Sequence, residues 1–301
     1  MKDFNSLLLI SFVKNRFEDG DYSGVPRFDW ELRKVFSNLV SLSDCFYSRL
    51  YLFYLSLFFS SKTVVITCNE LSLAVPKKLN TIVVHHGIAQ THFDRDEQWR
   101  DSEAQLFCHA QEKMYKLPNR IFVSPSMWCA TEFSNHYNVK TACVIPHWVE
   151  PIKKDPIDAT KKPIILGDWR SYNKGDYLID TLKERMPHVE FLQLKCTYYT
   201  RMHFYKRASG YLSLSLSEGA NYSMADAESA KIPILSTDVG LAYEFNCNII
   251  SWKDRDNIDL LENKLTQLLT QSKSSSFYDT WTFDDWSDAW KKVVSRFYDS
   301  H

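Results

Sequence analysis

Short runs of apolar, mostly β-branched residues recur along the chain, and segments with helical spacing lie between many of them. Such runs predict buried strands, because a strand covered on both faces needs no alternating polar positions. The predicted strands are Ser6–Phe12, Thr63–Thr67, Thr81–His85, Arg120–Ser124, Cys143–Ile145, Pro163–Leu166, Val189–Leu194, Tyr211–Leu216, Ile232–Leu235 and Asn248–Trp252. Strands that alternate with helices are typical of parallel sheets, so the sequence predicts an α/β fold, and some ten strands favour two sheets over one.

Helical spacing is clearest in the second half of the chain, where Leu178, Leu182 and Met186 are four residues apart. The predicted helices are Tyr177–Met186, Ser223–Ala230, Ile258–Gln271 and an aromatic, amphipathic helix at Trp281–Tyr298. Another apolar stretch, Leu50–Phe59, predicts a helix buried in the core of the first domain, and peripheral contact with a membrane is the alternative. No transmembrane segment is expected, because the uncharged run Leu50–Ser61 is well short of the ~20 residues that span a bilayer. No secretory signal is expected either, because the apolar run Leu7–Val13 ends at Lys14 without a small-residue cleavage site.

A change of composition divides the chain near its middle. The segment Glu150–Pro163 contains three prolines and four lysines and has little apolar content, as linkers do. We therefore predict a first domain at residues 1–150 and a second at 151–280, with the helix at 281–301 following the second.

Charge and cysteine content exclude several classes of protein. The 36 basic and 37 acidic residues leave a net charge of −1, so nothing indicates a nucleic-acid partner. The seven cysteines form no C-x-x-C pair, which argues against a zinc site or a disulfide framework and favours a reducing, cytoplasmic location.

Glycine is scarce, with 8 in 301 residues, and four of the eight come at or just after the end of a predicted strand. In parallel sheets the turns after strands meet at one edge, where ligands bind next to helix starts. Polar residues at these turns are therefore candidates for chemistry: His86 before Gly87, Arg170 and Lys174 after Gly167, and Glu218 before Gly219, with Asp226 further on. Two cations near a helix start suit a diphosphate, and carboxylates there can accept hydrogen bonds from sugar hydroxyls.

Five motifs in this order resemble those of retaining GT-B glycosyltransferases, especially glycosyltransferase family 4. Glu218 and Asp226 resemble the family's pair of acids separated by seven residues, and Gly167 through Lys174 resembles its diphosphate clamp. The other three motifs are Val83-Val-His-His-Gly87, Val144-Ile-Pro146 with Val149-Glu150, and Pro233-Ile-Leu-Ser-Thr-Asp-Val-Gly240. Together they span roughly residues 80–240.

This resemblance implies two Rossmann-like domains that face a central cleft, with the last helix crossing back to the first domain. It implies a nucleoside diphosphate sugar of the GDP-mannose or UDP-glucose type as donor, a glycan or glycoprotein acceptor, retention of configuration, and neither metal nor cofactor. The implied catalytic residues are His86, Arg170, Lys174 and Glu218. The implied donor-binding residues are Gly167, Arg170, Lys174, Glu218, Gly219, Ala220, Asn221, Tyr222 and Asp226.

The sequence departs from the family pattern at several of these positions. Asp226 is one methylene shorter than the family's Glu, Asp168 precedes the displaced Arg170, and Gly20 and Gly24 do not form the family's acceptor-side Gly-Gly pair. Asp226 also has a purely structural interpretation, because Ser223-x-x-Asp226 fits a capping box that closes a helix start. Lys174 and Arg170 can likewise be solvated loop charges.

Two other functions stay open. One is a catalytically inactive module that binds a nucleotide sugar or a glycan, which the departures above would explain. The other is a metal-dependent GT-A transferase, since the chain contains the D-x-D strings Asp19-Gly-Asp21, Asp94-Arg-Asp96 and Asp254-Arg-Asp256.

Overall fold

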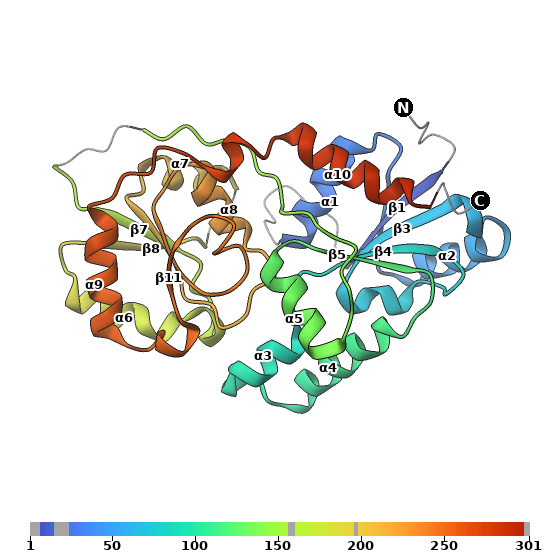
Figure 1. Cartoon of the computed structure of the whole chain (residues 1–301), viewed down its shortest axis with the longest axis horizontal. Coiled ribbons are helices and arrows are strands. Elements are labelled where there is room, and N and C mark those ends of the chain that lie inside the picture. The colour runs from blue at the N-terminus through green and yellow to red at the C-terminus, as the bar shows by residue number, and fades with distance from the viewer. Residues whose placement is uncertain (1–6, 15–23, 156–159, 196–197, 298–301) are drawn as a thin grey trace.

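The computed structural model of the chain describes residues 7–14, 24–155, 160–195 and 198–297. In these residues eleven strands form two separate sheets, and all neighbouring strands are parallel. Figure 1 shows the two sheets side by side with helices around each of them. The predicted fold class, α/β with two Rossmann-like domains on parallel sheets, is confirmed.

The first sheet has six strands in the order β2-β1-β3-β4-β5-β6. They are β1 (Leu8–Val13), β2 (Val40–Ser43), β3 (Thr63–Cys68), β4 (Asn80–Val84), β5 (Arg120–Ser124) and β6 (Cys143–Val144). The helices of this part are α1 (Gly24–Val35), α2 (Phe46–Phe58), α3 (Ala89–Arg95), α4 (Ser102–Tyr115) and α5 (Met127–Tyr137). The strand β2 was not predicted. It is a short edge strand that is only partly buried, so its residues lack the apolar run of a central strand.

The second sheet has five strands in the order β11-β10-β9-β7-β8. They are β7 (Ile164–Gly167), β8 (Glu190–Gln193), β9 (Gly210–Ser213), β10 (Ile234–Thr237) and β11 (Asn248–Ile250). The helices of this part are α6 (Asp176–Arg185), α7 (Tyr198–Arg207), α8 (Tyr222–Ser229) and α9 (Ile258–Leu269). Each of these strands overlaps a predicted strand, within the usual uncertainty of a few residues at the ends.

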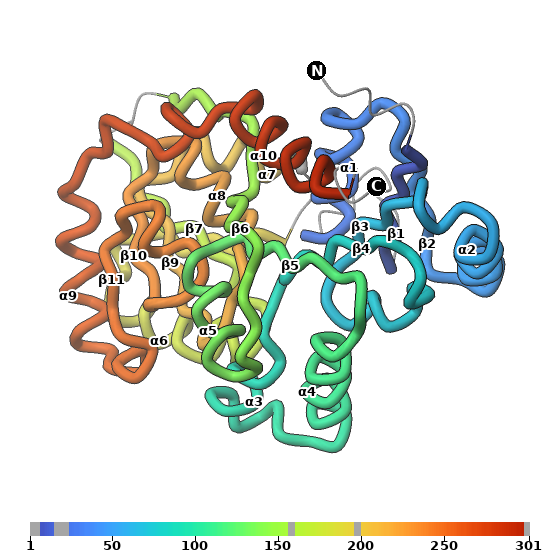
Figure 2. The backbone as a smooth tube through the Cα atoms, turned by 45° about the vertical axis from the view of Figure 1, so that its right-hand side comes forward, coloured from blue at the N-terminus to red at the C-terminus, as the bar shows by residue number. Residues whose placement is uncertain are grey.

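The last helix, α10 (Phe283–Ser295), follows the second sheet in the chain but lies against the first domain (Figures 1 and 2). Its start is fixed by a capping box between Thr282 and Asp285. Its buried side chains, Trp286, Trp290, Val293 and Val294, have the spacing of one helix face. The Trp290 ring lies 5.4 Å from the ring of Phe28 in α1.

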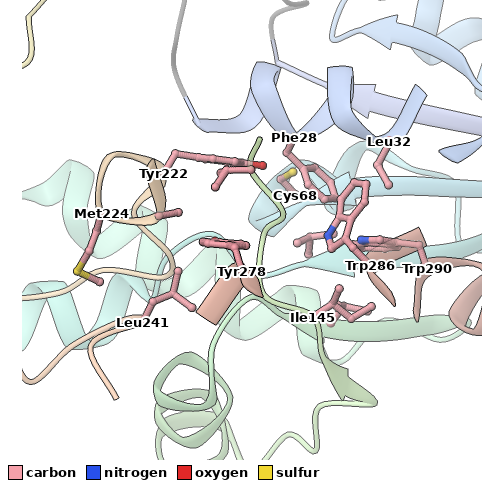
Figure 3. Close-up of a cluster of buried hydrophobic side chains, with 14 of the residues drawn as sticks. Phe28, Leu32, Cys68, Ile145, Tyr222, Met224, Leu241, Tyr278, Trp286 and Trp290 are labelled. Atoms are coloured by element: carbon pink, nitrogen blue, oxygen red, sulfur yellow. The ribbon is translucent and has the colours of Figure 1, made fainter. Parts of the chain in front are cut away.

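One hydrophobic cluster includes residues of both domains and of α10 (Figure 3). Phe28 and Leu32 of α1 pack in it with Trp286 and Trp290, and Tyr222 of α8 reaches it from the second domain. Burial of aromatic rings is the largest favourable contribution that side chains make to such a contact. The cluster therefore holds the two domains together on one side of their junction.

The helix α2 corrects one expectation. It forms where the apolar stretch predicts it, but only Ser48, Leu52, Leu55 and Ser56 are buried. Phe53 and Phe58 are 55% and 66% exposed, so the prediction of a helix buried in the core is wrong. An apolar stretch without charges on either face does not show which face packs on the sheet.

Candidate active site

The candidate site lies where the strand order of the second sheet reverses. β7 and β9 are neighbours, and the chain continues from β7 to β8 on one side and from β9 to β10 on the other. The loops after β7 and β9 therefore diverge and leave a crevice at the carboxyl ends of the strands, where open parallel sheets bind ligands. Lys174 belongs to the loop after β7, and Glu218 to the loop after β9.

Lys174 and Glu218 form an ion pair across this crevice. The Lys174 Nζ lies 3.1 Å from Oε2 of Glu218 and 3.3 Å from Oδ2 of Asp168. The same Asp168 oxygen accepts a hydrogen bond of 2.8 Å from Nη2 of Arg170. The expectation that the two loops meet is confirmed, and the meeting point contains two cations and two carboxylates. We call these four residues the cleft network.

The contacts within the cleft network shift three pKa values. Burial alone would lower the pKa of the Lys174 ammonium, but Glu218 and Asp168 raise it above its ordinary value. Burial would raise the pKa of Asp168, but Lys174 and Arg170 hold it below its ordinary value. Burial would lower the pKa of Arg170, but the hydrogen bond that Arg170 donates to Asp168 outweighs burial and raises this pKa. Because the shifts favour the charged forms, Lys174 and Arg170 are cations that an anionic ligand can attract.

Two glycines fix the loop after β7. Gly167 ends the strand, and a Cβ there would lie 2.6 Å from the carbonyl oxygen of Leu212 in β9. Gly175 has a φ of 75° and closes the single helical turn that contains Lys174. Both positions exclude side chains, so the backbone holds Lys174 at the edge of the sheet.

At Gly219 the backbones of the two domains lie close together. A Cβ on Gly219 would lie 2.4 Å from the carbonyl oxygen of His86, at the end of the first domain's β4. The Ser126 hydroxyl, also from the first domain, donates a hydrogen bond of 2.7 Å to the Gly219 carbonyl oxygen. The loop with Glu218 is therefore clamped directly against the predicted histidine.

The two adjacent histidines, His85 and His86, have different surroundings, because successive side chains of a strand point to opposite faces. His85 is fully buried, and its ring lies 3.6 Å from that of Phe133. His86 lines the cleft. Its Nε2 atom is buried and has no hydrogen-bond partner in the described part of the chain. Burial lowers the pKa of His86 to about 4, so its ring is neutral near pH 7.

A cavity of about 280 Å³ lies between the domains at the cleft network. Its walls include His86 and Gly87 from the first domain and Lys174, Glu218 and Gly219 from the second. The expected central cleft thus has walls from both domains, and of the predicted site residues His86, Lys174, Glu218 and Gly219 line it.

A second cavity, of about 670 Å³, lies in the first domain and shares Asn69, Glu70 and His86 with the cleft cavity. Lys14, which follows β1, and Leu71, which follows β3, also line it. β1 and β3 are the neighbours at which the first sheet reverses its strand order. This cavity is therefore the first sheet's counterpart of the crevice between β7 and β9.

Asp226 lies apart from the cleft network. Its two carboxylate oxygens each accept a hydrogen bond of 2.9 Å from the guanidinium of Arg27 in α1. The side chains of Arg27 and Asp226 are 2% and 1% exposed. The capping-box interpretation of Asp226 is wrong, because the side chain of Asn221 caps α8. Asp226 was also expected to bind the donor, but both of its carboxylate oxygens accept hydrogen bonds from Arg27 in this structure.

The turn before α8 offers backbone rather than side chains to a ligand. The Asn221 side chain accepts hydrogen bonds from the amides of Ser223 and Met224, and the Tyr222 ring stacks on His147 at 4.3 Å. The amides of Gly219, Ala220 and Asn221 donate no hydrogen bond to any described residue. Free amides at a helix start can hold an anion.

Sequence reasoning missed several residues of the site. The side-chain amide of Asn173 forms two hydrogen bonds with the backbone of Ser217. It donates one to the Ser217 carbonyl oxygen and accepts one from the Ser217 backbone N–H. Asn69 has a φ of 40° and accepts a hydrogen bond of 3.0 Å from the His86 amide. Asn69 and Glu70 directly follow the predicted strand Thr63–Thr67 and its Cys68. The rule applied to the other strand ends would have identified them, but no glycine marks this turn.

The D-x-D strings do not gather at the site. Asp96 accepts a hydrogen bond from His92 and caps a short helical turn, and Asp256 accepts one from Tyr177. The string Asp19-Gly-Asp21, with Gly20, lies outside the described residues. Within the described ranges, no three His, Cys, Asp or Glu side chains form a group that could hold a metal ion.

Comparison with known proteins identifies the fold. No family model matches the sequence, and no curated protein does. Sucrose-phosphate synthase from Thermosynechococcus elongatus superposes with a TM-score of 0.71 and 10% identity, over 97% of this chain and 100% of that one. HepE from Anabaena, in complex with UDP-glucose, superposes with a TM-score of 0.64 and 11% identity, over 96% of this chain and 99% of HepE. TarM superposes with a TM-score of 0.60 and 15% identity, and the match covers 81% of this chain and 57% of TarM. The chain has the two-domain GT-B fold of glycosyltransferases.

Proposed function

We propose that the protein is a glycosyltransferase that moves a hexose from a nucleoside diphosphate sugar to a hydroxyl group of a glycan or glycoprotein. We further propose that the transfer retains the configuration of the sugar and needs no metal ion. The observation that carries this proposal is the Lys174–Glu218 ion pair of 3.1 Å at the reversal of the second sheet, in a cavity shared with His86. Retention comes from the family resemblance alone.

The cations of the cleft network and the backbone of the next turn would bind the leaving diphosphate. Lys174 and Arg170 supply two positive charges, and the amides of Gly219, Ala220 and Asn221 are free to donate. Preorganised donors of this kind stabilise charge that develops on a leaving group, a role that a metal ion can also fill. A diphosphate has to replace carboxylates as the partner of Lys174.

Glu218 and His86 would contact the transferred sugar. Once a ligand takes Lys174, the Glu218 carboxylate is free to accept hydrogen bonds from sugar hydroxyls. The neutral His86 ring offers an unpartnered Nε2 atom in the same cavity. A neutral ring can accept or donate a hydrogen bond without repelling the positive charge that develops on the sugar.

The cavity of about 670 Å³ in the first domain is the proposed acceptor site. Glu70 lines both cavities, and its side chain makes no hydrogen bond or ion pair within the described residues. A free carboxylate at the junction of the two cavities suits an acceptor rich in hydroxyl groups. A cytoplasmic location is part of this proposal, because the six cysteines of the described ranges are free thiols.

A binding module without turnover is the second candidate. Asp168 favours it, since this carboxylate already neutralises part of the charge that a diphosphate needs. The GT-A alternative is not proposed again, because the chain has the GT-B fold.

Calorimetric titration with UDP-glucose, UDP-N-acetylglucosamine and GDP-mannose tests donor binding. We expect one of them to bind, and we expect Lys174→Met to weaken that binding at least ~tenfold, since a charge-assisted contact is lost. Lys113→Met, at an exposed position of α4, serves as the matched control. Failure of all three donors to bind the wild-type protein would contradict the proposal.

Release of nucleoside diphosphate separates the enzyme from the binding module. An enzyme releases the diphosphate from its bound donor in the presence of acceptor, and metal independence requires that EDTA leaves the rate unchanged. The anomeric configuration of the product, read by NMR, tests retention. Tight donor binding without any release would establish the binding module instead.

A further inference from the structure

The helix α2 carries the largest concentration of exposed apolar side chains in the described residues. Nine of the fifteen large apolar side chains that are exposed lie in residues 46–59. They are Phe46, Tyr47, Leu50, Tyr51, Phe53, Tyr54, Leu57, Phe58 and Phe59. We call these nine residues the α2 patch. Single exposed apolar residues are normal, but a contiguous group marks a surface that contacts something apolar.

The α2 patch contacts little besides itself. Tyr54 packs against Phe58 and Phe59, with ring centroids 5.1 and 6.1 Å apart, and Phe46 packs against Tyr47 at 5.8 Å. Figures 1 and 2 show α2 at the outer end of the first domain, away from the second domain. The patch is therefore not part of the contact between the domains.

The charges around the α2 patch indicate what covers it. Between Asp44 and Asn69 the chain has one acidic residue, Asp44, and two basic residues, Arg49 and Lys62. Asp44 pairs with Arg49 through hydrogen bonds of 2.7 and 2.8 Å, so the net positive charge of this stretch comes from Lys62. Basic residues beside an apolar helix face are attracted to anionic lipid headgroups while the apolar side chains enter the interface. In a two-fold contact with a second copy, both surfaces would carry the same net positive charge.

We propose that the α2 patch docks the protein onto the surface of a bilayer that contains anionic lipids. The helix lies on the bilayer and does not cross it, because its thirteen residues are fewer than the ~20 that a spanning helix needs. None of the helices in the described ranges meets the length and hydropathy of a membrane span. Tyrosine rings suit this position, since they have an apolar body and a polar hydroxyl at the water side.

The position of Arg49 links the docking surface to the site. Arg49 lies on the first turn of α2, among the residues of the α2 patch, and it also lines the cavity of about 670 Å³. Docking through the patch places the wall of this cavity close to the lipid headgroups. The docking itself does not depend on the proposed glycosyl transfer, because no donor or acceptor is involved.

Sedimentation with lipid vesicles tests the proposal on the full chain. We expect the protein to bind vesicles of phosphatidylcholine mixed with phosphatidylglycerol, and to bind pure phosphatidylcholine more weakly. The variant Leu50→Gln/Phe53→Gln/Leu57→Gln changes only exposed residues of α2, and glutamine is a good helix former. Binding of this variant should fall at least ~tenfold, because the buried apolar area is lost.

A matched control changes three exposed apolar residues far from α2 in the sequence, as Leu106→Gln/Met127→Gln/Tyr243→Gln, and should bind like the wild type. Light scattering on both variants and on the wild type measures the oligomeric state. Equal sedimentation of the wild type and the α2 variant would overturn the proposal, as would a wild type that binds neither kind of vesicle. A wild-type dimer that the α2 variant makes monomeric, without vesicle binding, would show that a second copy covers the patch. Each result is obtained without donor sugar, so it is distinct from failure of the proposed function.

Discussion

Glu218 and Asp226 are eight positions apart in one loop and helix, yet the structure places them in opposite surroundings. The Glu218 side chain is 17% exposed, lines the cleft cavity and pairs with Lys174 of its own domain. The Asp226 side chain is 1% exposed and pairs through both oxygens with Arg27 of the other domain. A motif that suggests two equivalent carboxylates thus contains one that a ligand can reach and one that the fold encloses.

The difference teaches that burial, rather than residue type, decides what a charged pair can do. A pair that is partly exposed can exchange its partner for a ligand, because water and the ligand replace what is lost. A buried, bidentate pair cannot exchange, because separation leaves two charges without solvent. The Arg27–Asp226 pair therefore joins the domains, and the Lys174–Glu218 pair is available for binding.

The largest effect is expected from breaking the enclosed pair. Arg27→Met leaves the Asp226 carboxylate buried without a counter-charge, which should lower the free energy of unfolding by about 3–5 kcal/mol. Urea denaturation followed by circular dichroism measures this. The double variant Arg27→Met/Asp226→Leu replaces the pair by apolar groups and should recover most of the loss.

The control for this prediction is Arg185→Met, which breaks an exposed pair with Asp259 and Glu262 on the protein surface. It should leave the stability almost unchanged, because exposed pairs contribute little. A small effect of Arg27→Met, similar to that of the control, would show that the enclosed pair does not hold the domains together.

The next largest effect is expected for Glu218, the carboxylate that a ligand can reach. Glu218→Gln keeps the shape of the side chain but removes its charge, and we expect kcat/KM for glycosyl transfer to fall about 10²–10³-fold. Its stability should stay close to that of the wild type, since the pair is partly exposed. Glu184→Gln, at an exposed position of α6, is the matched control. A large loss of stability in Glu218→Gln would mean that both pairs are structural.

The cleft network was predictable from the sequence because it rests on topology. Parallel strands end at one edge, and strand ends marked by glycine at Gly167 and Gly219 could be found from the apolar runs alone. The rule placed Lys174 and Glu218 together without any knowledge of distances. The two-sheet architecture followed from the same runs.

The enclosed pair and the exposed helix were not predictable. Arg27 and Asp226 are 199 residues apart, and nothing near either of them indicates that α1 crosses the junction between the domains. The face of α2 that packs on the sheet is no more apolar than the face that does not, so the sequence could not show which one is covered. The local sequence pattern determines where helices and strands form. Which residues of the two domains contact each other depends instead on how the two sheets are assembled.

A smaller effect concerns the pH dependence of stability, which two buried histidine rings at the junction between the domains determine. His86 and His147 stack with 5.3 Å between their rings, and burial lowers the pKa of both, that of His86 to about 4. The unfolded chain therefore takes up these protons at higher pH than the folded one, so stability is complete above about pH 6.5 and falls as the pH drops.

For His86 alone, we expect a loss of about 2 kcal/mol in the free energy of unfolding between pH 7 and about pH 5. His147 acts in the same direction. The variant His86→Gln, which does not titrate there, should show a flatter profile in urea denaturation over this range. An identical slope in wild type and variant would mean that the His86 ring is already solvated in the folded protein.

The smallest effect tests whether Asp168 in the cleft network competes with a ligand for the two cations. Asp168 is the carboxylate that departs from the family pattern, and it neutralises Lys174 and Arg170 at 3.3 and 2.8 Å. Asp168→Asn keeps a hydrogen-bond acceptor for both cations and removes the charge that a diphosphate must displace. The dissociation constant of the nucleoside diphosphate should therefore fall about three- to tenfold, as expected for one partly screened charge. Asp180→Asn, at an exposed position of α6, should leave calorimetric binding unchanged. Weaker binding in Asp168→Asn would show that this carboxylate holds the cations in place for the ligand. The cleft network would then be as rigid as the Arg27–Asp226 pair.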